Sequence, residues 1–399
     1  METSGRRNFI KNGAAAGLGL AASCSDSNRI DETAKIDDSI KKTGLDSTIR
    51  YRTLGSTGYQ VSEIGFGAMN TRNAELIHAA IDAGINYVDT AHGYMRGVNE
   101  EIVGSVMQTK RDKVFLTTKI GVWQSTDISG MLSLSLKRLQ TDHVDLVLMH
   151  AADERDQVNS QELMQKFDEV RQKGMTRFIG LSNHSNQSGV LDAVTEGKFW
   201  DAVLVGYNYF SSKDVSASIK QAREAGVAII GMKNLLNPHS DPWVPLADIR
   251  EDKSSSLTPQ QALIKWVLED PNVDTTIPGM ESFEHLAEDL AIMNMELAYD
   301  EKRTLRQFSE NIKDYYCCGL AGCIGCRNKC PNGVQVNEIN RCLGYVYGYS
   351  NLELARENYE RLDPSTKLEN CSDCTECKVK CVNGLNLTEN INRARSIFS

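Results

Sequence analysis

The sequence predicts an α/β fold, a (β/α)8 TIM barrel followed by a small helical domain rich in cysteine. Short apolar runs alternate with amphipathic segments over residues 50–300, the order expected for parallel strands joined by helices. The chain has 11 cysteines, and all except Cys24 lie between residues 317 and 381. A body without cysteine and a tail dense in cysteine indicate two units with separate chemistries, which we place at residues 50–300 and 301–399.

Composition places the chain among ordinary soluble globular proteins. Of its 399 residues, 41% are apolar and 24% are charged, which excludes wholesale disorder and a protein with many membrane spans. Lys and Arg number 44 against 53 Asp and Glu, which gives a net charge of −9. This acidic balance argues against nucleic acid as the main partner.

Residues 1–24 have the pattern of a twin-arginine export signal. Arg6 and Arg7 precede an uncharged stretch of small and apolar residues that is too short to span a membrane. The protein is therefore expected to be periplasmic or anchored at the membrane. Cys24 is a candidate for a lipid anchor, although Ala21 stands where lipoproteins usually have Leu or Val. An ordinary flexible terminus is the alternative.

Residues 25–49 lack apolar periodicity and are expected to form a linker to the barrel. Eight apolar runs are predicted as its buried parallel strands: Glu63–Gly67, Asn86–Thr90, Val114–Lys119, Val144–His150, Thr176–Ser182, Ala202–Tyr207, Val227–Met232 and Thr275–Pro278. Amphipathic segments between them are predicted as helices: Glu75–Ala83, Glu100–Gln108, Met131–Gln140, Gln161–Lys173, Ser216–Ala225 and Pro259–Glu269. A doubly wound sheet is the alternative, but no Gly-x-Gly-x-x-Gly motif follows an early strand.

Four titratable side chains follow three consecutive predicted strands. Asp89 ends the second strand, with Tyr94 in the loop after it, while Lys119 ends the third strand and His150 the fourth. Catalytic groups of such barrels lie at the C-terminal ends of the strands, so we expect these four to meet. A Lys119 ammonium held by Asp89 would lower the pKa of Tyr94, and His150 would donate a hydrogen bond to a carbonyl oxygen. The set predicts a site that reduces a carbonyl group.

Short motifs in residues 50–300 together resemble those of the aldo-keto reductase family. They are Asp89-Thr90-Ala91-His92-Gly93-Tyr94, Asn99-Glu100-Glu101-Ile102-Val103-Gly104, Val114-Phe115-Leu116-Thr117-Thr118-Lys119, Val144-Asp145-Leu146-Val147-Leu148-Met149-His150 and Ile179-Gly180-Leu181-Ser182-Asn183. The resemblance implies a nicotinamide cofactor, NAD(P), that lies extended across the barrel mouth. It also implies that Tyr94 is the general acid, that Lys119 and Asp89 tune it, and that His150 orients the carbonyl.

The resemblance further implies which residues bind the cofactor. Ser182 and Asn183 correspond to the pair that holds the nicotinamide carboxamide, and further contacts are expected at Met232, Lys233, Gly279 and Met280. Because an exported enzyme has no cytoplasmic pool of cofactor to exchange with, we expect the cofactor to be bound tightly.

Two positions depart from the family pattern. Leu204 stands where many relatives have a Gln that contacts the carboxamide, and His285 stands about where relatives that prefer the phosphorylated cofactor have Arg. Loss of fixed cations removes charge-assisted bonds to a 2′-phosphate, for which Lys233 is a candidate replacement. The choice between NAD and NADP therefore stays open.

The cysteine spacings of the tail predict two [4Fe–4S] clusters. The ligands are expected to be Cys371, Cys374, Cys377 and Cys381, which have the ferredoxin spacing, and Cys323, Cys326, Cys330 and either Cys317 or Cys318, of which we take Cys317. The residues after the last cysteine of each run are alike, so we expect a two-cluster ferredoxin-like unit in which that cysteine binds the other cluster. Zinc sites and disulfides are the alternatives.

Together these features predict an exported oxidoreductase that transfers hydride between tightly bound NAD(P) and a carbonyl or hydroxyl group of a small molecule, such as a sugar. The alternative is an iron–sulfur electron-transfer or binding lipoprotein whose barrel is catalytically silent. A redox partner is expected if the clusters carry electrons, and none is needed if they are structural.

Overall fold

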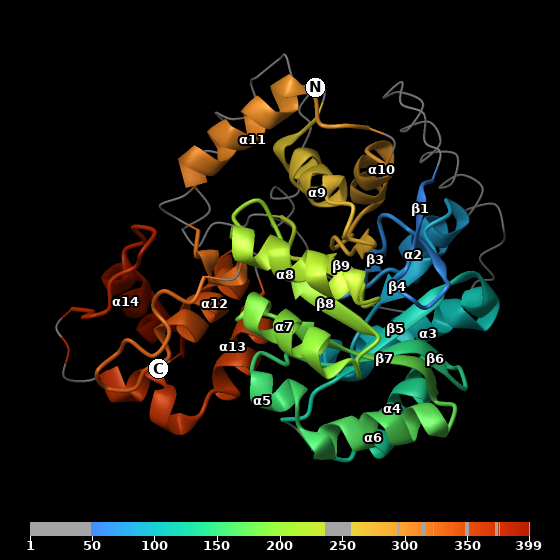
Figure 1. The fold of residues 1–399 in the computed structure, drawn as a ribbon, viewed down its shortest axis with the longest axis horizontal. Helices are drawn as coiled ribbons and strands as arrows, with labels where there is room; N and C mark the ends of the chain where they lie inside the picture. Colours follow the sequence, from blue (N-terminus) through green and yellow to red (C-terminus); the bar gives the residue numbers. More distant parts are fainter. Residues whose placement is uncertain are drawn as a thin grey trace, which may run out of the picture.

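The computed structural model describes residues 49–123, 125–235, 257–293, 295–312, 316–321, 323–347, 351–371, 374 and 376–398 (Figure 1). The predicted export signal, Cys24 and all but the last residue of the predicted linker lie outside the described residues. Within the described part of the chain, no helix is long and apolar enough to cross a membrane.

Eight parallel strands form one curled sheet in chain order: β3 (Phe66–Gly67), β4 (Tyr87–Asp89), β5 (Phe115–Ile120), β6 (Val144–Met149), β7 (Thr176–Asn183), β8 (Ala202–Gly206), β9 (Ala228–Met232) and β10 (Thr275–Thr276). Parallel bridges pair Ile64 with Thr276 and Gly67 with Gly279, so the first and last strands meet and the sheet closes. A Cβ at Gly67 would lie 2.8 Å from the carbonyl oxygens of two residues across this seam, which explains the glycine. The predicted eight-stranded parallel sheet is confirmed.

Helices surround the sheet (Figure 1): α2 (Ala74–Asp82), α3 (Val98–Lys110), α4 (Ile128–Leu139), α5 (Arg155–Val158), α6 (Gln161–Gln172), α7 (Gln187–Gly197), α8 (Lys213–Glu224), α9 (Pro259–Glu269) and α10 (Phe283–Ala291). Alternate strand residues face opposite sides of the sheet. Leu146 and Leu148 of β6 pack inside the barrel, whereas Val147 and Met149 pack against the helices. The strands are buried on both faces, which is why they appear in the sequence as unbroken apolar runs.

A hairpin of β1 (Tyr51–Thr53) and β2 (Gln60–Ser62) precedes the barrel and was not predicted, because its strands are only three residues long and partly exposed. Leu54 and Val61 pack with the residues of the barrel interior. The Gly55 N–H donates a hydrogen bond to Asp274 Oδ2 (2.9 Å), at the start of β10. The hairpin therefore closes the N-terminal end of the barrel and leaves the C-terminal strand ends as its mouth.

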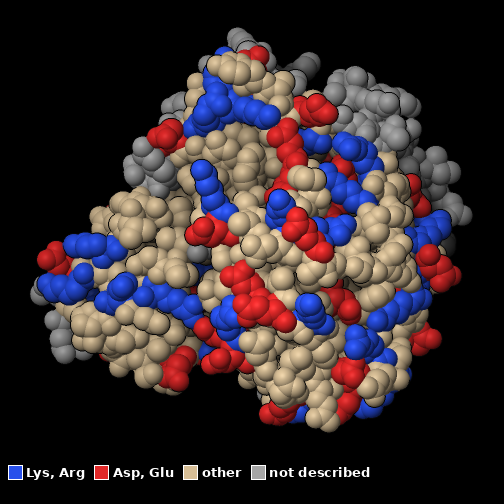
Figure 2. Space-filling view, viewed as in Figure 1, with Lys and Arg blue, Asp and Glu red and all other residues tan. Residues whose placement is uncertain are grey.

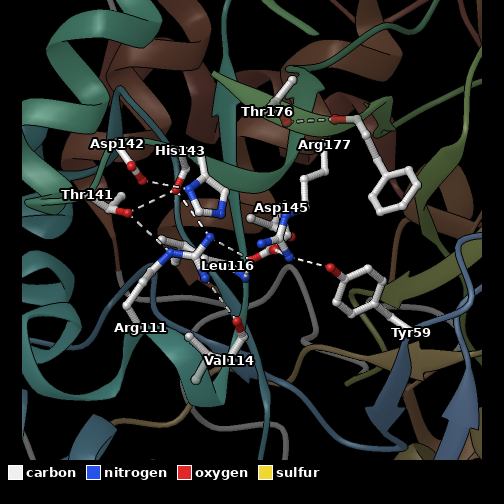
Figure 3. A network of polar contacts seen from close by, with 12 residues as sticks. Tyr59, Arg111, Val114, Leu116, Thr141, Asp142, His143, Asp145, Thr176 and Arg177 are labelled. Carbon is white, nitrogen blue, oxygen red and sulfur yellow. Dashed lines mark hydrogen bonds and ion pairs between the residues drawn. The ribbon is translucent and has the colours of Figure 1, made fainter. Parts of the chain in front are cut away.

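A buried carboxylate ties neighbouring strands together at this closed end (Figure 3). Asp145, which is 1% exposed, accepts a hydrogen bond from a backbone N–H of β5 (2.8 Å) and forms ion pairs with Arg111 (2.9 Å) and Arg177 (2.8 Å). Asp201 and Asp274 repeat the arrangement, each accepting a backbone N–H of the neighbouring strand at 2.9 Å. Because all three carboxylates are paired and lie far from the mouth, we assign them to stability.

In the described part of the chain, four α-helices follow the barrel: α11 (Tyr299–Ile312), α12 (Val336–Tyr347), α13 (Leu352–Glu360) and α14 (Leu387–Phe398). Leu305 and Phe308 of α11 belong to the core between the sheet and its helices. A separate core begins at Cys317 and contains Ile339 and Leu343 of α12 with Ile391 of α14. We call residues 317–398 the C-terminal unit.

The C-terminal unit packs on the barrel beside the ends of the strands, as two ion pairs show. Glu353 of α13 forms an ion pair with Arg96 (3.0 Å), in the loop after β4. Arg327 forms another with Glu154, in the loop after β6. These contacts place the C-terminal unit over the mouth of the barrel.

Candidate active site

Lys119 lies at the centre of the predicted site. Its ammonium, with 2% of the side chain exposed, forms an ion pair with Asp89 Oδ1 and donates a hydrogen bond to the carbonyl oxygen of Thr90 (2.8 Å). It also donates to the Tyr94 hydroxyl (3.2 Å). Met95 and Arg96 follow Tyr94 with φ of 50° and 55°, a strained conformation that fixes the loop carrying the tyrosine. The structure thus brings Asp89, Lys119 and Tyr94 into contact.

Burial controls the proton affinity of these groups. Burial raises the pKa of Tyr94, and the opposing charge of Lys119 does not cancel the rise. Burial alone would lower the pKa of Lys119, but Asp89 and Tyr94 raise it above its ordinary value. Lys119 lowers the pKa of Tyr94, as predicted, but burial outweighs this effect. Tyr94 is therefore protonated at neutral pH, the state that a proton donor needs.

His150 completes the predicted set. Its ring is 9% exposed and lies 5.9 Å from the Tyr94 ring, centroid to centroid, in an edge-on arrangement. Burial lowers the pKa of His150 well below its ordinary value, and the charges of Lys119 and Arg361 lower it further. A neutral imidazole donates one N–H, so His150 is suited to orient a carbonyl oxygen while Tyr94 supplies the proton.

Ser182 and Asn183, at the end of β7, adjoin this group. Ser182 Oγ accepts a hydrogen bond from the N–H of Ala151 (2.9 Å), the residue after His150. Asn183 Nδ2 donates to Asp153 Oδ1 (3.1 Å), whereas Asn183 Oδ1 is buried and has no partner among the described residues. A buried acceptor without a donor is costly, so Asn183 Oδ1 fits the N–H of a nicotinamide carboxamide.

The remaining residues expected to contact the cofactor lie in different environments. Met232 and Leu204 pack in the barrel interior, so Leu204 cannot replace the amide of the expected Gln. Met280 is fully buried in the outer core, which leaves only its backbone for such a contact. Gly279 has no other atom near the position of a Cβ. His285 accepts a hydrogen bond from the N–H of residue 281 (3.3 Å).

Comparison with known proteins identifies the barrel. Residues 63–241 match the family model of the aldo/keto reductase family. This segment contains β3 to β9 and all four residues of the predicted catalytic set. Residues 63–241 form an aldo/keto reductase domain. The chain therefore contains an aldo/keto reductase domain and is an oxidoreductase, as the sequence predicts.

Relatives of the aldo/keto reductase domain agree with this assignment. The oxidoreductase YqkF of Bacillus subtilis is 24% identical over 298 residues, which cover 64% of this chain and 94% of the relative. The aldo-keto reductase YhdN of Bacillus subtilis is 34% identical over 160 residues, 34% of this chain and 48% of the relative. An aldo-keto reductase from Klebsiella pneumoniae, solved in complex with NADPH, shares the fold with a TM-score of 0.56 at 24% identity, over 65% of this chain and 95% of that chain.

The C-terminal unit places residues over the mouth of the aldo/keto reductase domain that the sequence did not assign to the site. Arg341 of α12 donates to the Tyr345 hydroxyl (3.1 Å), and Lys233 donates to the same oxygen (3.5 Å). The Arg361 guanidinium lies 4.1 Å from the Trp123 ring centroid, and that ring lies 5.3 Å from His150. The sequence predicted only helical packing for residues 343–370. It contains no pattern that links residues of the C-terminal unit to the distant barrel residues Lys233 and Trp123.

The cysteines of the C-terminal unit gather in two groups. A small cavity is lined by Cys317, Cys318, Cys323, Cys326 and Cys381. In the second group, burial raises the pKa of the Cys377 thiol, and the nearby Cys371, Cys330 and Cys374 raise it further. Cys381 thus lies with the first run, and Cys330 lies near cysteines of the second run. Cys317 and Cys318 both line the cavity.

Two asparagines also connect each cysteine run to the other. Asn383, which follows the second run, donates from Nδ2 to Cys323 Sγ (3.6 Å), and Asn332, which follows the first run, donates to Cys374 Sγ (3.8 Å). The two halves of the C-terminal unit therefore resemble each other in contacts as well as in sequence. Among the described residues, the ten cysteines from 317 to 381 are free thiols, and no three His, Cys, Asp or Glu side chains are arranged to hold a single metal ion.

Proposed function

We propose that this chain is an NAD(P)-dependent oxidoreductase that interconverts a carbonyl and a hydroxyl group on a small molecule. The observation that carries the proposal is the Tyr94 hydroxyl, held 3.2 Å from the buried Lys119 ammonium and edge-on to His150. A protonated phenol, a cation and a neutral imidazole at one point can donate a proton to an oxygen that gains negative charge. This is the requirement of carbonyl reduction.

The chain's own residues perform the proton half of the reaction. His150 orients the carbonyl oxygen by donating a hydrogen bond, and Tyr94 gives its proton to the oxygen as that oxygen becomes an alkoxide. Lys119 stabilises the tyrosinate that this transfer leaves, while Asp89 keeps the lysine charged. A bound nicotinamide supplies the hydride, and Ser182 with Asn183 would hold its carboxamide. In the oxidative direction Tyr94 accepts the proton instead.

We also propose that the C-terminal unit binds two [4Fe–4S] clusters. The cavity lined by Cys317, Cys323, Cys326 and Cys381, and the second group of four around Cys377, support it. Hydride transfer moves two electrons and a cluster usually passes one, so without a flavin or quinone partner the clusters are better suited to hold α12 and α13 over the mouth. We assign them this structural role.

Export in the folded state follows as a proposal from Arg6 and Arg7. Changing both to Lys is expected to leave folded protein, loaded with its clusters, in the cytoplasm, because the twin-arginine route depends on that pair. Cell fractionation measures the outcome, and export of the double variant at the normal level contradicts the proposal. If Cys24 is lipidated, Cys24→Ala releases the mature protein from membranes, whereas unchanged membrane association excludes the lipid anchor.

Turnover with a panel of neutral and acidic carbonyl compounds tests the proposed activity. Full-length protein purified without air is expected to oxidise NADH or NADPH with at least one aldehyde, ketone, sugar or oxo acid, followed by the loss of nicotinamide absorbance. Absence of turnover with both cofactors across the panel contradicts the proposal.

A further inference from the structure

Three cations meet beside the proposed catalytic residues, and two of them come from the C-terminal unit. Arg341 and Lys233 both donate to the hydroxyl of Tyr345, at 3.1 Å and 3.5 Å, although one belongs to α12 and the other follows β9. Arg361 lies over Trp123, next to His150. The Tyr345 oxygen thus accepts hydrogen bonds from two positively charged side chains. A carboxylate oxygen is bound by the same kind of donors.

Lys233 is the unusual member of this group. Its φ of 56° is left-handed, a conformation that costs a non-glycine residue free energy and that often marks a functional position. Its side chain is only partly exposed, and it forms no ion pair with any carboxylate in the described part of the chain. Burial lowers the pKa of Lys233. A desolvated cation without an ion pair is costly, so the position favours an anion supplied from outside.

The nearby carboxylates are engaged elsewhere. Glu338 pairs with Arg341 (2.7 Å), and Glu357 lies 3.9 Å from Arg361. Asp153 Oδ1 accepts three N–H groups, from Asn183 Nδ2 and the backbone of residues 184 and 185, at 3.1, 2.6 and 3.0 Å. Burial, the largest effect, raises the pKa of Asp153 to about 6. Among the residues that the structure describes, none of these carboxylates forms an ion pair with Lys233, whose ammonium donates to the Tyr345 hydroxyl.

The field at the mouth is positive. The charges of Lys119, Arg361, Arg341 and Lys233 all lower the pKa of His150, in addition to the larger effect of burial. The whole chain has a net charge of −9, yet Figure 2 shows Lys and Arg side chains in a band across the C-terminal unit toward the barrel. Local positive potential on an acidic protein attracts anionic substrates.

We propose that Lys233, Arg341 and Tyr345 bind a carboxylate group of the substrate, so that the enzyme acts on oxo acids or sugar acids and the corresponding hydroxy acids. This inference rests on the proposed function, because it places the carboxylate beside the carbonyl that Tyr94 and His150 engage. The C-terminal unit is then part of the substrate site as well as its cover. A neutral sugar or ketone forms no ion pair with Lys233 or Arg341 and is expected to bind more weakly.

Calorimetry with matched ligands tests the proposal without requiring turnover. Full-length protein, purified without air and supplied with oxidised cofactor, is titrated with benzoylformate, pyruvate and glucuronate, and with the methyl esters of all three. We expect at least one acid to bind about ten- to a hundredfold more tightly than its ester, the effect of one or two charge-assisted hydrogen bonds. In Lys233→Met this ratio of dissociation constants falls toward one.

Lys198→Met is the matched control, because Lys198 is exposed and has the same left-handed conformation, with φ of 50°, at the end of α7. It is expected to keep the wild-type ratio. Arg341→Gln provides a second test if Lys233→Met does not fold. The proposal is overturned if no acid binds more tightly than its ester, or if both mouth variants keep the wild-type ratio. If the acids bind as predicted but no compound is turned over, the carboxylate site is supported and only the proposed catalysis is contradicted.

Discussion

Tyr94→Phe is expected to lower kcat by about 10²–10⁴-fold, the usual contribution of a general acid. The substitution removes one hydroxyl and keeps the ring that lies over Lys119 and beside His150. Packing and cofactor affinity should therefore change little, because the lost interaction forms chiefly in the transition state. Steady-state kinetics with any substrate of the panel measures the effect.

Tyr51→Phe is the matched control for this experiment. Its hydroxyl donates to the carbonyl oxygen of Gly84 (2.9 Å), away from the mouth, so its removal should leave kcat unchanged. A loss of less than about threefold in Tyr94→Phe refutes the assigned role. If Lys119 tunes the tyrosine, Lys119→Met should lower the rate comparably and shift its pH dependence, since Tyr94 then loses its cation.

Single cysteine variants are expected to fall into two classes. The classes are defined by which cysteines lie together in the structure, and not by which cysteines belong to the same run of the sequence. Cys381→Ser should affect the same cluster as Cys323→Ser, and Cys330→Ser the same cluster as Cys374→Ser, because each last cysteine lies with the other run. A hydroxyl is a poorer ligand for iron than a thiolate, so each variant should lose up to about half of the iron. Iron and sulfide analysis with electron paramagnetic resonance of the reduced protein distinguishes the classes.

Cys342→Ser is the control, since Cys342 is fully buried in the core of the C-terminal unit and belongs to neither group. It should keep both clusters. Zinc without iron in protein purified without air contradicts the cluster proposal. Classes that follow the two sequence runs contradict the crossed arrangement.

The barrel and its four rim residues were predictable because their signals are local. A strand buried on both faces shows as an apolar run, and the residue that ends it lies at the mouth, so Lys119 and His150 could be placed from the sequence alone. The net direction of the pKa of Tyr94 could not, because it depends on burial by chain segments far away in sequence. The β1–β2 hairpin escaped prediction because strands this short have no periodicity.

The contribution of the C-terminal unit to the site was beyond the sequence for a different reason. Arg341 and Tyr345 lie on an amphipathic helix, where an arginine and an aromatic residue indicate only packing and solvent exposure. Arg341 and Tyr345 lie near Lys233 because the core of the C-terminal unit packs against the barrel. Packing between two separate cores produces no periodic pattern in the sequence. The cysteine spacing, by contrast, is a local pattern, and the two clusters that it indicates stay a prediction.

Transfer of a deuterium label tests the central claim, that this site performs direct hydride transfer, most directly. Full-length protein is loaded with NADH or NADPH that carries deuterium at both C4 positions of the nicotinamide, so that transfer from either face is labelled, and is mixed with a carbonyl compound that it turns over. Mass spectrometry then locates the label in the alcohol product. We predict deuterium on the carbon that carried the carbonyl oxygen, with the transfer strongly slowed in Tyr94→Phe. A product formed without deuterium on that carbon would contradict the assignment of the site to direct hydride transfer.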